Sequence, residues 1–160
     1  MEKELTFEEK YNNLKLQNEK LRTEIDYMNM IFDEYVITST TDTKGMIINI
    51  SKPFEEISGY SKEELIGKPH NIVRHEDVSS SIFAKLWETI SNKKLWRGEI
   101  KNRKKDGGFY WVDSIVIPLF DSNQEIKGYR AIRIDITDKK KICDDYAHFF
   151  IEHEEDWKIK

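Results

Sequence analysis

The chain has 160 residues, of which 38% are hydrophobic and 35% are charged, and its formal net charge at pH 7 is -4. This length allows one domain and a helical appendage, and the high charged fraction indicates that part of the chain is a solvated helix. The acidic balance argues against nucleic acid as the main partner. No run approaches the roughly 18 apolar residues that span a bilayer, and no signal-peptide pattern opens the chain, so we expect a cytoplasmic protein.

Residues 1–34 contain no glycine or proline and carry a heptad pattern, which predicts a long helix. Asn18 occupies an a position, where a lone polar residue favours a parallel, in-register coiled coil, so we expect a homodimer. The alternative is an amphipathic helix that packs on its own domain. The d positions are Phe7, Leu14, Leu21 and Met28, and the a positions are Tyr11, Asn18, Ile25 and Phe32.

Residues 35–138 contain all the glycines and prolines and predict a mixed domain, followed by a linker helix over 139–160. Two strands, several short helices and a three-stranded meander predict an α+β fold: a five-stranded antiparallel sheet with helices on one face. Ser61 and Glu64 form a capping box for one short helix. The expected strands are 36–40, 46–50, 95–103, 109–119 and 126–136, and the expected helices are 52–58, 61–66 and 79–91.

This order of elements, with the motifs that it carries, resembles a PAS domain. The carrying stretches are residues 57–68 (ISGYSKEELIGK), 96–99 (WRGE), 103–107 (RKKDG) and 128–137 (GYRAIRIDIT). The resemblance implies the PAS fold and a signalling role, with a downstream domain or protein as partner. No nucleophile beside a base and no phosphate loop is visible, so we do not expect an enzyme.

Residues 67–77 (GKPHNIVRHED) are similar to a segment of aerotaxis-receptor PAS domains. That subfamily binds FAD non-covalently and reports redox state or oxygen, so the resemblance implies FAD here. Two positions depart from the pattern: Glu76 replaces a proline, and Ser51 stands where an asparagine is frequent. PAS domains of this sequence type also include members without a known ligand.

The resemblance places a ligand between the sheet and the helices that include residues 74–77. There Arg74 could grip a phosphate bidentately and His75 could donate from a ring nitrogen. Asp77 could orient either one, and Asn102 could offer a donor and an acceptor to an isoalloxazine edge. As alternatives, Arg74 and Asp77 could form a structural ion pair, and His75 could be an ordinary loop residue.

Trp87, Trp96 and Trp111 could stack on a flavin or donate electrons to it, although Trp87 on an apolar helix face also suits core packing. Two alternatives to FAD stay open: an empty, side-chain-filled core, and haem bound through His70 or His75. Cys143, the single cysteine, lies outside the predicted domain. This position excludes a flavin–cysteine adduct and an internal disulfide.

Overall fold

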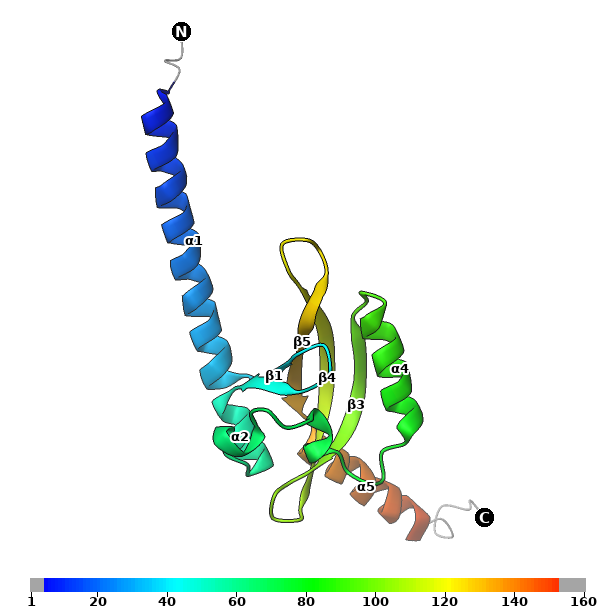
Figure 1. Ribbon diagram of the computed structural model, residues 1–160. Helices are drawn as coiled ribbons and strands as arrows, with labels where there is room; N and C mark the ends of the chain where they lie inside the picture. Colours follow the sequence, from blue (N-terminus) through cyan, green and yellow to red (C-terminus); the bar gives the residue numbers. More distant parts are fainter. Residues whose placement is uncertain (1–4, 153–160) are drawn as a thin grey trace, which may run out of the picture.

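The computed structural model describes residues 5–152, with side chains to residue 145, so the expected segments 1–34 and 139–160 both extend beyond the described residues. Figure 1 shows a sheet with helices on one face and a long helix that projects from it. The predicted α+β fold is confirmed. The elements are α1 (Phe7–Tyr35), β1 (Ile37–Thr41), β2 (Ile47–Ile50), α2 (Lys52–Ser58), α3 (Lys62–Leu65), the 3-10 helix η1 (His70–Val73), α4 (Ser80–Ser91), β3 (Trp96–Arg103), β4 (Phe109–Phe120), β5 (Ile126–Asp135) and α5 (Thr137–Glu152).

All strand pairs are antiparallel, in the order β2-β1-β5-β4-β3, so the first and last strands of the sequence lie side by side at its centre. β5 pairs with β1 over Ile37 to Thr41 and with β4 along most of its length. Side chains alternate between the two faces of a strand. The face that carries Tyr129, Ala131 and Arg133 is therefore turned towards the helices, and these three residues are buried.

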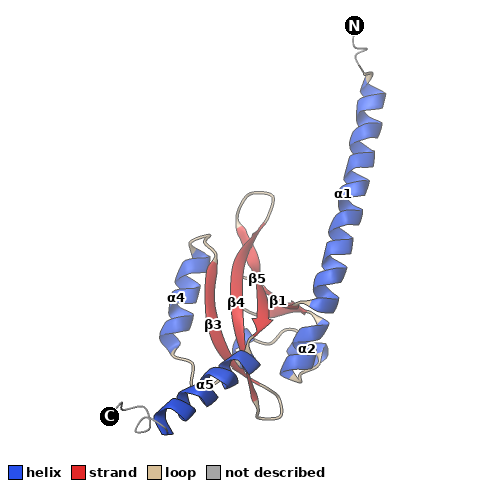
Figure 2. Ribbon diagram, turned by 180° about the vertical axis from the view of Figure 1, so that it is seen from behind, coloured by secondary structure: helices blue, strands red, loops and turns tan. Residues whose placement is uncertain are grey.

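Two hydrophobic clusters hold the helices on that face. In the larger cluster, Leu86 and Ile90 of α4 pack with residues of β3, β4 and β5. In the smaller one, Phe54 of α2 and Leu65 of α3 pack with β2 and with Val73 of η1. The capping box of Ser61 and Glu64 begins α3 as predicted. The view from behind in Figure 2 shows α4 beside β3 at one lateral edge of the sheet and α2 beside β1 at the other.

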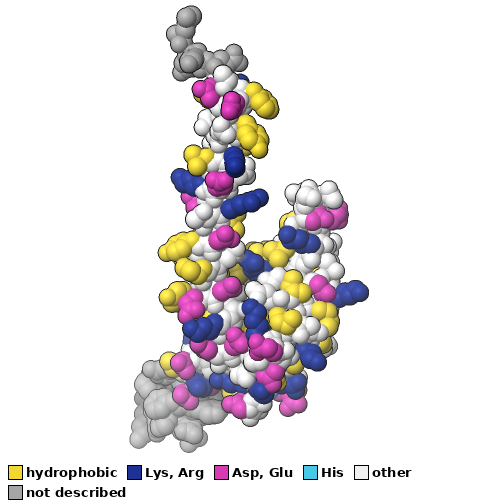
Figure 3. All heavy atoms as spheres, turned by 60° about the vertical axis from the view of Figure 1, so that its left-hand side comes forward, with side chains coloured by type: hydrophobic (Ala, Val, Ile, Leu, Met, Phe, Trp, Pro, Cys, Tyr) yellow, Lys and Arg dark blue, Asp and Glu magenta, His cyan; other side chains and the backbone are white. Residues whose placement is uncertain are grey.

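Helix α1 begins at a capping box of Thr6 with Glu9, which the sequence analysis had not singled out. Its described residues include none that is buried, and Figure 3 shows hydrophobic side chains along the projecting helix. Phe7 is 86% exposed and Leu14 58% exposed. The helix thus does not lie along its own domain. No helix among residues 5–152 is both long and apolar enough to cross a membrane.

Gly128 lies where β5 comes closest to the end of β1. A Cβ atom added to it would stand 2.3 Å from the carbonyl oxygen of Thr41, a contact that only backbone movement could relieve. Gly128→Ala should therefore lower the free energy of unfolding by about 2–3 kcal/mol, as overpacking does in a tight interior.

The matched control is Gly107→Ala, because Gly107 has a φ of +91° and, beyond its chain neighbours, no described residue has an atom within 4 Å of the added Cβ. Its cost should be about 1 kcal/mol, from the left-handed backbone alone. Urea denaturation of the three proteins measures both values. Equal losses in the two variants would contradict the close contact at Gly128.

Candidate functional site

A cavity of about 350 Å³ lies between the helix-facing side of the sheet and the segment from η1 to α4. Its size is in the range of small-molecule sites. β1, β5, β4 and β3 supply one wall, and η1, the following loop and α4 supply the other. The lining residues are Ser39, Thr41, Lys44, Gly45, Pro69, His70, Asn71, Arg74, Phe83, Leu86, Trp87, Ile90, Ile100, Ser114, Val116, Tyr129, Ala131 and Arg133.

Much of the lining is apolar, and part of it is aromatic. Ile100, Val116 and Ala131 form part of the sheet wall, and Phe83 and Trp87 face it from α4. The indole of Trp87 meets the Tyr129 ring edge-on at 5.4 Å between centroids, and a Cβ at Gly45 would stand 3.0 Å from that indole. Trp87 is 38% exposed, so it lies where the cavity approaches solvent.

A polar group of residues lies at the opposite, buried part of the lining. Arg133 donates from Nη1 to the Ser39 hydroxyl at 3.0 Å and from Nη2 to His70 Nε2 at 2.9 Å. Burial lowers the pKa of Arg133 to about 10, which leaves it charged at neutral pH. Burial of the imidazole, together with the Arg133 charge, lowers the pKa of His70 to about 3. His70 is therefore neutral and accepts at Nε2.

The described lining holds three basic residues, Lys44, Arg74 and Arg133, and no Asp or Glu. The chain as a whole is acidic, with a net charge of -4. A concave site lined by one sign of charge concentrates ligands of the opposite sign. The arrangement thus suits a largely apolar, planar ligand that carries negative charge.

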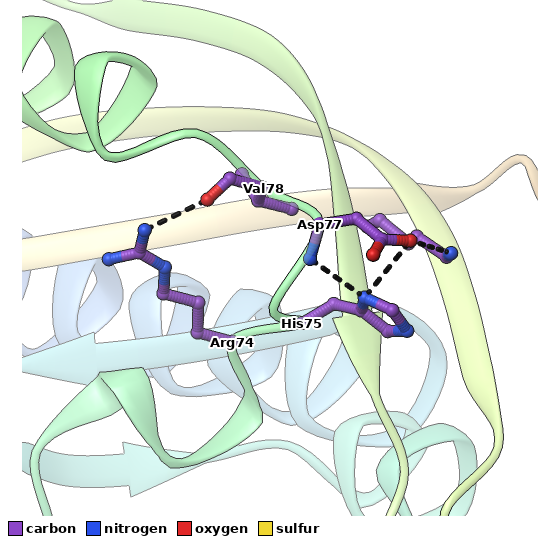
Figure 4. Close-up of polar contacts among 5 residues, drawn as sticks. Arg74, His75, Asp77 and Val78 are labelled. Atoms are coloured by element: carbon purple, nitrogen blue, oxygen red, sulfur yellow. Dashed lines mark hydrogen bonds and ion pairs between the residues drawn. The ribbon is translucent and has the colours of Figure 1, made fainter.

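Arg74 separates from the two neighbours with which the sequence grouped it, as Figure 4 shows. Its Nη2 donates to the carbonyl of Val78 at 2.8 Å, and its guanidinium stacks on Phe83 at 4.4 Å in the cavity wall. Asp77 instead pairs with Lys101 at 2.5 Å, and this ammonium holds the pKa of that carboxyl below its usual value. The alternative of an Arg74–Asp77 ion pair is not the observed arrangement.

His75 lies with Asp77 on the side of the loop away from Arg74. The backbone N–H of Asp77 donates to His75 Nδ1 at 3.2 Å, and the imidazole meets the Phe109 ring at 6.0 Å. Neither His75 nor Asp77 is part of the cavity lining. Of the charged residues expected in the ligand site, Arg74 alone lines the cavity.

The remaining expected residues occupy three different environments. Trp87 lines the cavity, whereas Asn102 is buried on β3 beside Tyr110 and outside the lining. Trp96 is buried and folds over Gly98, where an added Cβ would stand 2.7 Å from the indole. Trp111 lies on the other face of the sheet, with the ammonium of Lys140 from α5 5.1 Å from its ring.

The two departures from the expected motif also have a place in the structure. Ser51 is fully buried, and its hydroxyl accepts from the backbone N–H of Thr38 at 2.8 Å. Its role there is to join β1 to the start of α2. Glu76 is exposed in the loop between η1 and α4.

Comparison with known proteins gives the same result as the fold. The sequence matches the PAS fold family over residues 47–133. The chain belongs to the PAS fold family. It is 39% identical to the aerotaxis receptor of Escherichia coli (strain K12) over 108 residues. This match covers 68% of the present chain and 21% of the receptor.

Two further relatives agree with that assignment. The nitrogen fixation regulatory protein of Klebsiella oxytoca is 28% identical over 69% of this chain and 22% of its own length. The crystal structure of a PAS domain from Colwellia psychrerythraea has a TM-score of 0.66 at 31% identity, covering 71% of this chain and 98% of that one. The chain thus spans about a fifth of the length of these two curated relatives. The predicted resemblance to PAS domains, including those of aerotaxis receptors, is confirmed.

Except for Arg74, the sequence analysis missed the polar residues that line this PAS cavity: Ser39, Thr41, Lys44, His70 as a lining residue, Asn71, Ser114 and Arg133. A signal existed for Arg133, because Arg130 and Arg133 are three apart on one strand and must lie on opposite faces. One arginine therefore had to point to the helix-covered side. Nothing in the local sequence says that His70 and Ser39 lie next to it.

The lowered pKa of His70 makes the domain sensitive to acid. An unfolded histidine binds a proton near pH 6.5, whereas folded His70 does so only near pH 3, so the unfolded state binds more protons between these values. Folded His70 stays neutral over this range, and proton uptake by the unfolded histidine increasingly favours unfolding as pH falls. Between pH 7 and pH 5 this residue alone should lower the free energy of unfolding by about 1–2 kcal/mol.

Urea denaturation of wild type and His70→Gln at the two pH values tests this, because glutamine keeps an acceptor for Arg133 and does not titrate. The variant should lose about 1–2 kcal/mol less than the wild type between pH 7 and pH 5. An identical pH dependence in both proteins would show that His70 is not a buried neutral acceptor.

Proposed function

We propose that this chain is a cytoplasmic sensory PAS domain that binds FAD non-covalently and signals redox or oxygen state through its flanking helices. The observation that carries the proposal is the cavity, whose described lining combines apolar walls, several hydrogen-bond donors and three cations without an acid. Relatives named as an aerotaxis receptor and a nitrogen fixation regulatory protein support a sensory role. FAD would supply a ring that takes up and releases electrons.

The residues present fit this cofactor in shape and in charge. Ile100, Val116 and Ala131 on the sheet and Phe83 on α4 offer apolar surface to the two faces of a ring. Lys44 is exposed and Arg74 is partly exposed, so both can meet the pyrophosphate where the cavity approaches solvent. The Ser114 hydroxyl is buried without a partner among the described residues and is free for a ring substituent.

The alternatives to flavin receive less support. Haem would need an axial ligand, but His70 Nε2 already lies 3.0 Å from the Ser39 hydroxyl and 2.9 Å from Arg133. His75 lies outside the lining. A core filled by side chains would leave no room for a ligand, whereas this one encloses about 350 Å³. Cys143, the single cysteine of the sequence, is exposed on α5, which accords with non-covalent binding.

Among the residues expected to hold FAD, we assign direct contact to Arg74 and Trp87. Asn102 lies on β3 outside the cavity lining, and its backbone pairs with that of Arg74, so we assign it a role in positioning this arginine. The other four expected residues would not contact FAD directly. We assign an indirect role through neighbouring residues to His75 and Asp77, and a role as electron donors at longer range to Trp96 and Trp111.

The projecting helix α1 supports a homodimer. Its a and d side chains from Phe7 to Met28 are exposed along one strip, and Phe32 is half-buried where the C-terminal end of the helix meets the domain at α2 and β1. A helix of this length gains stability by burying such a strip against a second copy. Signals from the cavity would then pass to a partner protein or domain through paired helices.

The purified protein should show flavin absorption in the visible and near ultraviolet, or gain it on reconstitution with FAD. Arg74→Ala and Asn102→Ala should each lower the bound fraction severalfold, because the first removes a contact and the second its support. The controls are Arg97→Ala, whose partner is Asp113, and Asn123→Ala in an exposed turn. Full occupancy in both site variants would remove this site assignment, and a Soret band would favour haem.

Asn18→Ile tests the coiled coil. In the single helix the Asn18 amide donates to the Leu14 carbonyl at 3.0 Å. An apolar side chain at this a position should tighten association and relax the preference for a dimer, giving mixed oligomers in sedimentation. Asn13→Ile makes the same change at a c position, off the strip, and should leave the wild-type dimer unchanged. A wild type that is monomeric at micromolar concentration would rule out the dimer.

A further inference from the structure

The buried end of the cavity is formed by Ser39, His70, Ser114 and Arg133, which we term the inner polar site. Arg133 is 6% exposed and Ser114 1% exposed, and both line the cavity. Ser114 on β4 and Arg133 on β5 are paired directly in the register of these neighbouring strands, so their side chains lie next to each other. The sheet therefore presents a charged and a neutral donor side by side.

None of the described residues supplies a counter-charge to Arg133 in this site. Its two recorded hydrogen-bond partners, Ser39 and His70, are neutral. Phe54 supplies a ring 5.3 Å from its guanidinium, which is a weaker substitute for a carboxylate. No Asp or Glu of the described chain forms an ion pair with it or lines the cavity. A buried unpaired charge is unfavourable, so something else must stabilise it.

Ser114 adds a second, independent sign of a missing partner. Its hydroxyl oxygen is fully buried and has no hydrogen-bond partner among the described residues. A buried hydroxyl normally finds a partner, because leaving it without one costs its desolvation free energy. The hydroxyl lies next to Arg133 in a wall of the cavity, so one ligand edge can reach both groups.

His70 and Ser39 position the arginine. Because the Arg133 Nη2–H donates to His70 Nε2, that nitrogen must carry a lone pair, and the imidazole proton resides on Nδ1. Ser39 receives the donation from Nη1 at 3.0 Å. With both contacts made, the guanidinium is held at the cavity wall by β1 and η1.

We propose that Arg133 and Ser114, positioned by His70 and Ser39, bind the acceptor-bearing edge of a planar heteroaromatic ligand and favour its negatively charged form. This inference rests on the proposed function. For FAD it directs the carbonyl-bearing edge of the ring to the inner polar site and the phosphates towards Lys44 and Arg74. From Arg133 to Tyr129 the strand rises about 13 Å at 3.3 Å per residue, room for a ring along β5.

A purely structural role for Arg133 makes different predictions. If the arginine served only to tie η1 to the sheet, its removal would destabilise the protein in the absence of ligand. If it awaits a ligand, removing the unpaired charge should leave the unliganded domain as stable or more stable. The structural role also gives no account of the unpartnered Ser114 hydroxyl.

The test compares wild type, Arg133→Met and Ser114→Ala, as full chains. We expect the flavin-free variants to melt at or above the wild-type temperature, and FAD to bind at least tenfold more weakly to Arg133→Met and severalfold more weakly to Ser114→Ala. Arg130→Met is the control, since Arg130 lies on the same strand with its side chain on the other face. It should change neither quantity.

The reduction potential of bound flavin is the readout that a structural role would not move. Dithionite supplies two electrons and solvent supplies one proton, so the ring gains one negative charge. Loss of Arg133 should weaken binding of the reduced form about tenfold more than that of the oxidised form, which lowers the potential by about 30 mV for a two-electron couple.

Ser114→Ala keeps the test decisive if Arg133→Met does not fold, because it removes only an unpartnered hydroxyl. This inference alone would be overturned if the wild type binds FAD and every variant that folds, Arg133→Met or Ser114→Ala, keeps the wild-type affinity and reduction potential. A colourless wild type that FAD cannot reconstitute would overturn the proposed function, and this inference with it.

Discussion

The pairing of β1 with β5 determines where the rest of the molecule lies. It joins segments about ninety residues apart in the sequence, from Ile37 opposite Arg133 to Thr41 opposite Tyr129. A slip of one residue would turn every side chain of the strand to the other face. Arg133 would then leave the cavity and Ile134 would enter it. The fold and the cavity thus depend on one register, and Gly128 allows the two backbones to come together at its end.

The cavity persists because small side chains occupy the strands beneath it. Ala131 and Ser114 lie on β5 and β4, where larger residues would fill the space against α4. The second cluster, around Phe54 and Leu65, holds α2, α3 and η1 next to the cavity. Because close-packed interiors resist deformation, helices that are fixed by this cluster do not readily move into the cavity. A ligand can therefore be accommodated without rearranging the core.

Turn residues and strand periodicity predicted every strand to within a residue or two, because glycine turns and β-branched runs are local signals. The polar end of the cavity was not predictable in the same way. On β5 the apolar residues Ile132 and Ile134 suggest the buried face, yet Ile134 is 67% exposed and Arg133 faces inward. His75 and Asp77 looked like partners of Arg74, but Lys101 on a strand distant in sequence binds Asp77. Such contacts arise from tertiary packing, which a motif does not encode.

The same strand that carries the inner polar site also leads into a flanking helix. Two residues after Arg133, the Asp135 carboxylate accepts from the backbone N–H of Thr137 at 2.9 Å and caps the first turn of α5. The Thr137 hydroxyl in turn accepts from the N–H of Trp111 at 2.9 Å, which ties that turn to β4. β1, which supplies Ser39, follows directly on α1. A ligand that stabilises one position of Arg133 over another therefore acts on β1 and β5, the strands from which α1 and α5 extend. A ligand that bound both positions equally well would not couple the cavity to the packing of these helices.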